Sequence, residues 1–221
     1  MVIPTSAEIA LRKINKLVEK LAAEHRPLSN EEVSDSVEEI ATKMQLTLDK
    51  AMNAIWLKYN SKAEGKNKAY VYFPCLRSEE KLQTKLNQCQ MSNLADLNSE
   101  LYATILATQP IEEGNWLSLL SDIASIRHER SPDTQKRVQK STIIGQGQDG
   151  VRLSMRTGPN GEITELSGYA WGTGGEIQPM NVQHLRSVIS YFSDHNVRVV
   201  PWAKDTAKKV DKTVRTVYRL I

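Results

Sequence analysis

Glycine is distributed unevenly along this chain of 221 residues, and its distribution separates a helical part from a β part. Nine of the 11 glycines lie between residues 145 and 175, and residues 1–140 contain only Gly65 and Gly114. A glycine inside a helix costs about 1 kcal/mol relative to alanine, because its backbone loses more conformational freedom on folding. The first 140 residues can therefore be helical throughout, whereas residues 145–175 cannot.

Apolar residues at three-to-four spacing predict where the helices of the first part lie. A capping box of Ser29 and Glu32 opens an apolar stripe that lasts about 27 residues, as far as Tyr59. The pair Thr5 and Glu8 has the same spacing and predicts the start of an earlier helix. Shorter helices are expected over residues of about 78–91, 93–108 and 115–129.

After residue 140 the apolar pattern changes from a helical period to alternation. The Asn160-Gly161 pair favours a tight hairpin turn between two of the alternating segments. We therefore expect three strands, over Thr142–Ile144, Val151–Met155 and Ile163–Ala170.

Two more helices are expected after these strands. Asn181 would cap one that continues to Phe192, and the other would run from about Trp202 to the end of the sequence. The predicted fold class is α+β, mainly α: a helical bundle, then a small antiparallel β-sheet, then two C-terminal helices. We expect one composite domain, in which the bundle spans 1–140, the β segment spans 141–180, and the helices of 181–221 pack back on the bundle.

Charge is as unevenly placed as glycine. The whole chain has 29 Lys and Arg against 26 Asp and Glu, a net charge of +3. Residues 198–221 contain seven basic and two acidic residues, so this segment carries +5 and the remainder carries −2. No apolar run is long enough for a transmembrane span, and the N-terminus lacks a signal-peptide pattern. We expect a cytoplasmic protein that makes no membrane contact.

Several motifs that suggest catalysis or metal binding fail on inspection. Gly145 to Gly150 has the G-x-G-x-x-G pattern, but a strand-like sequence follows it, where a dinucleotide site needs a helix. His128-Glu129 begins like H-E-x-x-H, yet Pro132 occupies the second histidine position. The two cysteines are interpreted as small apolar residues rather than nucleophiles. We expect neither a metal nor an organic cofactor.

The terminal helix combines two opposite faces. At 100° per residue, its aliphatic side chains fall within roughly 60° of one another. The basic side chains cluster within roughly 80° on the other side. Such a basic stripe is suited to RNA phosphates, and the simpler interpretation is a solvated surface. The aliphatic residues are Val210, Val214, Val217 and Ile221, and the basic ones are Lys204, Lys208, Lys212, Arg215 and Arg219.

A series of short landmarks occurs in a recognisable order between residues 35 and 175. It comprises the long helix with Leu48-Asp49-Lys50-Ala51, then Phe73-Pro74, then Gln109-Pro110, and a helix that closes on Ile126-Arg127-His128 before a β segment. This order resembles a group of uncharacterised bacterial proteins related to the HEPN (higher eukaryotes and prokaryotes nucleotide-binding) superfamily. The resemblance implies a helical bundle that pairs into homodimers.

The resemblance also implies a site. Active members of that superfamily cleave RNA with an R-x4-6-H motif on a late bundle helix. His128 matches its histidine, and Arg127 is the basic residue before it, but residues 121–124 contain no arginine. Arg127 or Arg130 would have to supply the cation that stabilises the developing phosphorane charge. Arg130 is also expected to bind nucleic acid, together with the basic residues of the terminal helix. The structural alternative for His128 is a helix-terminal histidine that complements the helix dipole.

Two functions follow as hypotheses. The first is a HEPN-like intracellular protein of stress or phage defence that binds RNA or a nucleotide, either as a metal-independent ribonuclease or as a degenerate relative. The second is a non-catalytic module for dimerisation or protein interaction within a larger assembly, which the missing arginine favours.

Overall fold

The structure is a computed structural model, and it describes residues 3–23, 29–60, 71–111, 116–126, 134–143, 150–157, 163–171, 177–179, 183–192, 195 and 197–221. Between 135 and 189 the description covers the backbone. The chain divides into two compact units. The bundle unit comprises Met1–Gln135 and Ser190–Ile221, and the β unit comprises Lys136–Ile189. We had expected the narrower limits 141–180 for the β segment.

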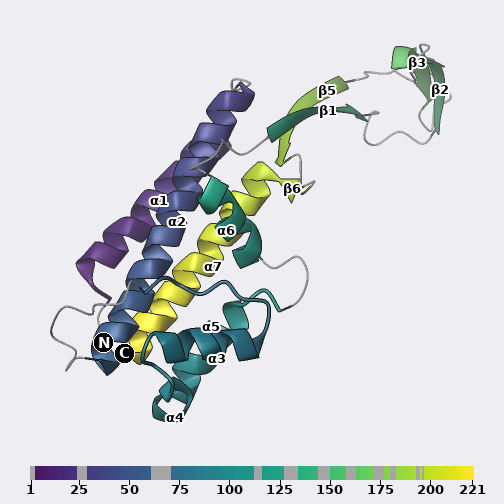
Figure 1. Cartoon of the computed structure of the whole chain (residues 1–221). Helices are drawn as coiled ribbons and strands as arrows, with labels where there is room; N and C mark the ends of the chain where they lie inside the picture. Colours follow the sequence, from purple (N-terminus) through teal and green to yellow (C-terminus); the bar gives the residue numbers. More distant parts are fainter. Residues whose placement is uncertain are drawn as a thin grey trace. The chain divides into compact units, whose positions relative to one another are not determined.

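The described part of the bundle unit is helical, as the apolar periodicity predicts. Helices α1, α2 and α7 lie side by side, α5 and α6 pack against α7, and α6 also packs against α2 (Figure 1). The helices are α1 (Thr5–Ala23), α2 (Asn30–Tyr59), α3 (Glu79–Gln88), α4 (Leu94–Leu97), α5 (Ser99–Thr108), α6 (Trp116–Ile126) and α7 (Val199–Leu220).

The start of α2 confirms the predicted capping box. The backbone N–H of Glu32 donates to Ser29 Oγ at 3.0 Å, and the backbone N–H of Ser29 donates to Glu32 Oε2 at 2.7 Å. The pair Thr5 and Glu8 also marks the start of a helix as predicted, since α1 begins at Thr5. The pair does not form a capping box, because the backbone N–H of Glu8 donates to the carbonyl of Pro4. The carboxylate of Glu8 binds Arg215 instead.

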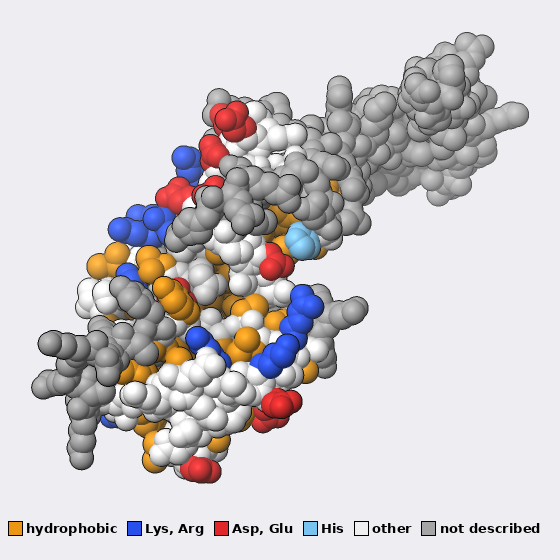
Figure 2. Space-filling model, in the orientation of Figure 1, with side chains coloured by type: hydrophobic (Ala, Val, Ile, Leu, Met, Phe, Trp, Pro, Cys, Tyr) orange, Lys and Arg blue, Asp and Glu red, His pale blue; other side chains and the backbone are white. Residues whose placement is uncertain are grey.

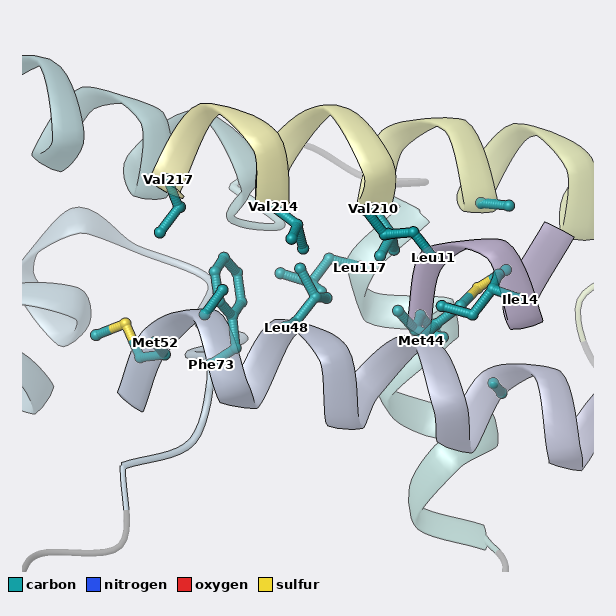
Figure 3. Packing of buried hydrophobic residues seen from close by; sticks show 14 of the residues in the cluster. Leu11, Ile14, Met44, Leu48, Met52, Phe73, Leu117, Val210, Val214 and Val217 are labelled. Atoms are coloured by element: carbon teal, nitrogen blue, oxygen red, sulfur yellow. The ribbon is translucent and has the colours of Figure 1, made fainter. Parts of the chain in front are cut away.

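Charged side chains of both signs are scattered over the face of the bundle unit drawn in Figure 2, with hydrophobic atoms between them. The core lies between α1, α2 and α7, where apolar side chains of the three helices point toward one another (Figure 3). The ring of Phe73, from the segment before α3, lies between α2 and α7 in the same cluster (Figure 3). Packing across three helices therefore also fixes this non-helical segment.

The helix expected over 93–108 is divided into α4 and α5 by Asn98. Its backbone is non-helical, with φ −156° and ψ 84°, and its side-chain oxygen accepts the N–H of Leu101 at 2.9 Å. Asparagine is a favoured N-cap, because its short side chain competes for backbone donors. Asn98, as the N-cap of α5, therefore separates the two helices.

Six strands are described, and they form two three-stranded sheets, in the orders β1-β5-β6 and β2-β3-β4. Strands β2 and β3 are antiparallel, with Val151 opposite Ala170, and the register shifts between Arg156 and Thr157. The hairpin turn expected at Asn160-Gly161 lies outside the described residues. The strands are β1 (Thr134–Ile143), β2 (Gly150–Thr157), β3 (Ile163–Trp171), β4 (Ile177–Pro179), β5 (Gln183–Phe192) and β6 (Val197–Arg198).

One of the two predicted C-terminal helices is wrong. Residues 183–192, expected to be helical after Asn181, form β5, which pairs with β6 through Tyr191 opposite Arg198. This segment is rich in β-branched and aromatic residues, which favour a strand wherever a partner strand is present. The other predicted helix is confirmed as α7. The fold class, α+β and mainly α, is confirmed as well.

Candidate nucleic-acid interface

Helix α7 has the two faces that its sequence predicts. Val210, Val214 and Val217 are completely buried against the rest of the bundle unit. Ile221, expected in the same stripe, is only partly buried. The predicted basic residues are all exposed, and they are Lys204, Lys208, Lys212, Arg215 and Arg219.

The two arginines of this basic face form ion pairs with carboxylates. Arg215 Nη1 lies 2.8 Å from Glu8 Oε1, and Arg215 Nε lies 2.9 Å from Asp211 Oδ2. The hydrogen bond from Arg215 lowers the pKa of Glu8, and the bonds to Glu8 and Asp211 raise the pKa of Arg215. Arg219 Nη2 lies 3.7 Å from Glu100 Oε1. Both arginines are therefore partly neutralised within the bundle unit.

Lys204, Lys208 and Lys212 form what we call the lysine row. They follow one another at four-residue intervals along α7, so their Cα atoms are about 6 Å apart at 1.5 Å per residue. Within the part of the chain that the structure describes, no carboxylate lies within ion-pairing distance of any of the three. The lysine row is therefore the part of the basic face that is available to an anionic partner.

A groove of about 480 Å³ lies between α5 and α7, beside the lysine row. Lys212 belongs to both the row and the groove. The sequence carries no signal for this site, because α5 has no chemical motif and only tertiary packing brings Trp116 beside α7. We call this site the α5–α7 groove, and its lining is Glu100, Ala103, Thr104, Ala107, Thr108, Trp116, Lys209, Lys212, Thr213 and Thr216.

The predicted catalytic residues cannot be placed beside this surface. Helix α6 ends at Ile126, and Arg127, His128 and Arg130 lie outside the described residues. The structure thus brings the five predicted basic residues of α7 onto one exposed face, and it leaves the proposed RNA-cleaving residues as a hypothesis from the resemblance alone.

Two of the sequence landmarks touch each other. Asp49, of the Leu48-Asp49-Lys50-Ala51 landmark, accepts hydrogen bonds at its Oδ1 from the backbone N–H of Phe73 at 2.8 Å and from Gln45 Nε2 at 3.0 Å. Burial raises the pKa of Asp49, and these two hydrogen bonds oppose the rise. These hydrogen bonds fix the Phe73-Pro74 segment against α2.

A second hollow, of about 490 Å³, adjoins this contact, and we call it the α2–α6 pocket. Its lining includes Asp49, Phe73, Cys75 and Ser121. Cys75 is partly buried, and burial raises the pKa of its thiol, which disfavours the thiolate form. Cys89 is buried. The burial of both cysteines agrees with their interpretation as small apolar residues.

The described residues contain neither a metal-binding cluster nor a helix that could cross a membrane. No cluster of three or more His, Cys, Asp or Glu side chains in them has the arrangement needed to hold a metal ion. None of the described helices combines the length and the apolar character that a membrane crossing requires.

Comparison of the chain with protein-family models, with curated proteins and with solved structures finds no match. The resemblance to HEPN proteins is therefore carried by the landmarks in the sequence alone.

Proposed function

We propose that this chain is a HEPN-like protein that binds RNA through the lysine row of α7. The observation that carries the proposal is the lysine row itself: three exposed ammonium groups on one helix face, none of them paired with a carboxylate among the described residues. Phosphate groups are the anions that such a row suits best, because they repeat at short intervals along a nucleic-acid strand.

The proposal predicts how RNA affinity depends on salt. Each phosphate contact to a single strand contributes about −0.7 to the slope of log K against log salt concentration, because bound counterions are released. Three contacts therefore give a slope of about −2. Replacement of Lys204, Lys208 and Lys212 together by Gln should weaken RNA binding at low salt by about tenfold or more and reduce that slope toward zero.

The measurement is fluorescence anisotropy of a labelled single-stranded RNA, titrated with protein at several salt concentrations. Helix α1 offers a matched control, since Lys13, Lys16 and Lys20 are also exposed on one helix. Their replacement by Gln removes the same charge and should leave most of the affinity and the slope intact. Equal loss in both triple variants, or no RNA binding by the native protein, would show that the proposal is wrong.

The catalytic form of the proposal assigns His128 as general acid or base and Arg127 or Arg130 as the cation that stabilises the transition state. General acid–base catalysis contributes about 10²–10⁴-fold in rate, so His128→Ala should slow RNA cleavage by that order, with no effect of a metal chelator. Cleavage by the native protein and by His128→Ala at the same rate would show that the catalytic form of the proposal is wrong. A role in stress or phage defence follows from the resemblance.

A second candidate function is dimerisation or protein interaction. It is favoured by Leu46 and Tyr72, which have 50% and 57% of their surface exposed and both line the α2–α6 pocket. Large exposed apolar side chains beside a hollow are typical of contact surfaces. The molar mass from light scattering should be that of a dimer, and Leu46→Glu should give the monomer. A monomeric native protein at all concentrations would contradict this function.

A further inference from the structure

The α5–α7 groove combines chemical groups that the lysine row does not have. Trp116 contributes an aromatic ring, and Lys209 and Lys212 contribute two ammonium groups. Ala103 and Ala107 are exposed on the α5 side, so that side carries no long side chain at these positions. The volume of about 480 Å³ lies within the range of about 300–1,000 Å³ that small-molecule sites occupy.

Hydrogen-bonding capacity is divided between the two walls. On α5, the hydroxyl of Thr104 already donates to the carbonyl of Glu100 at 2.8 Å, so toward a ligand it can only accept. Thr108 is buried, donates to the carbonyl of Ile105 at 2.7 Å and already accepts from Gln109 Nε2 at 3.1 Å. The carboxylate of Glu100 accepts as well. The α5 wall therefore suits a ligand that carries N–H donors.

The α7 wall has the opposite character. Lys209 Nζ lies 2.7 Å from Asp205 Oδ2, which uses one of its three N–H donors, and Lys212 has no carboxylate partner among the described residues. On a helical wheel with 100° per residue, the groove residues of α7 cover an arc of roughly 100°. The arc begins at Lys212, which also belongs to the lysine row, and continues through Thr216 and Lys209 to Thr213. The α7 wall thus suits an anion, and it continues the surface along which phosphates would bind.

We propose that the α5–α7 groove receives one unstacked base of a single-stranded RNA, whose backbone follows the lysine row. The base stacks on Trp116 and donates its amino group to the acceptors of α5, while the adjoining phosphate binds Lys212 and Lys209. Aromatic stacking beside a row of cations is the usual basis of single-strand binding. An acidic peptide would use the lysines but would leave Trp116 and the α5 acceptors without partners. This inference rests on the proposed RNA binding.

The experiment compares two variants of the groove that keep every lysine. Trp116→Leu removes the stacking surface, and Ala107→Leu fills the groove at an exposed position. The probe is a fluorescently labelled oligoadenylate of about 12 nucleotides, within the site sizes of about 4–16 nucleotides known for single-strand binding folds. Loss of one stacked base should weaken binding on the order of tenfold. The salt slope should not change, because no phosphate contact is lost. Ala22→Leu, at an exposed position of α1, is the matched control and should bind as the native protein does.

The outcomes separate this inference from the proposed function. If the native protein binds oligoadenylate with a slope near −2 and both groove variants bind equally well, the groove inference is wrong and RNA binding stands. If polyglutamate displaces the RNA from the native protein and binds the groove variants unchanged, the partner is an acidic protein and the inference is wrong. If the native protein binds AMP but not oligoadenylate, and Trp116→Leu abolishes AMP binding, the groove is a nucleotide site and the lysine row is not an RNA surface.

Discussion

Asp49 is a partly buried carboxylate whose hydrogen bonds hold a chain segment in place. Its Oδ1 accepts the N–H of Phe73, and the ring of Phe73 lies between α2 and α7 (Figure 3). An asparagine at this position would offer the same accepting oxygen without the charge. The charge itself is unfavourable to the fold, because burial is the largest influence on the pKa of Asp49 and raises it.

The sign of this pKa change gives the first prediction. Because the folded-state pKa lies above the unfolded one, the stabilising contribution of Asp49 is complete below the unfolded pKa and is lost as pH rises through the folded pKa. Asp49→Asn should therefore unfold at a higher denaturant concentration than the native protein at pH 7, and this advantage should vanish in acid. Asp49→Ala should be less stable than Asp49→Asn at both pH values, by about 1–3 kcal/mol, because it leaves the Phe73 N–H without its acceptor.

Urea unfolding at pH 4 and pH 7, followed by circular dichroism, measures both effects. A native protein and an Asp49→Asn variant whose unfolding midpoints differ by the same amount at the two pH values would contradict the assigned titration.

At the scale of the elements, Asn98 joins the ends of three helices. Its Nδ2 donates to Tyr59 Oη at the end of α2, at 3.0 Å, and to the carbonyl of Leu220 at the end of α7, at 3.1 Å. Its Oδ1 caps α5 at Leu101. The last carbonyls of a helix have no partner inside that helix, so a donor from outside stabilises the end.

The second prediction separates these roles. Asn98→Asp keeps the cap of α5 and loses both donated bonds, whereas Asn98→Ala loses all three. Asn98→Ala should destabilise the protein by about 1–3 kcal/mol, and Asn98→Asp should recover the share of about 1 kcal/mol that an N-cap contributes. The measurement is again urea unfolding, and equal stability of the two variants would show that the cap contributes nothing.

Signals within single elements made much of this architecture predictable. The capping box of Ser29 and Glu32 and the valines of α7 need no information from distant residues, and both predictions are confirmed. The segment of β5 was predicted to be a helix, because its apolar positions fit both the helical period and the alternation of a strand. Which of the two forms depends on pairing with a strand that is distant in the sequence. The contact of Asp49 with Phe73 and the placing of Trp116 beside α7 depend on tertiary packing, which no spacing in the sequence reports.

At the scale of the whole molecule, the chain leaves the bundle unit in β1 and returns to it in β5. Each of these two strands has a residue that contacts the helices of the bundle unit. Thr134 Oγ1, at the start of β1, donates to the carbonyl of Asn30 at 3.1 Å. Phe192, at the end of β5, is buried and meets Trp202 edge-on, with ring centroids 5.1 Å apart. Both contacts lie between residues of the bundle unit itself.

The third prediction follows from this division. Replacement of residues 136–189 by a Gly/Ser linker of about ten residues, which spans roughly 17 Å, should leave the bundle unit folded. The variant should keep its helical circular dichroism and unfold in one cooperative transition. Loss of the cooperative transition would show that the bundle requires the β unit, and unchanged oligoadenylate binding would place the RNA surface on the bundle alone.

Because α7 packs on α1, α2, α5 and α6, it also sets the timing of folding. The ion pair of Glu8 and Arg215 joins residues 207 positions apart, so assembly of the bundle must close a very long loop. During synthesis, the apolar faces of α1 and α2 emerge long before their last partner, while the β2–β3 hairpin can form as soon as it leaves the ribosome. We therefore expect the nascent chain to depend on chaperones until α7 is complete, and a premature stop before residue 199 to give an aggregating fragment.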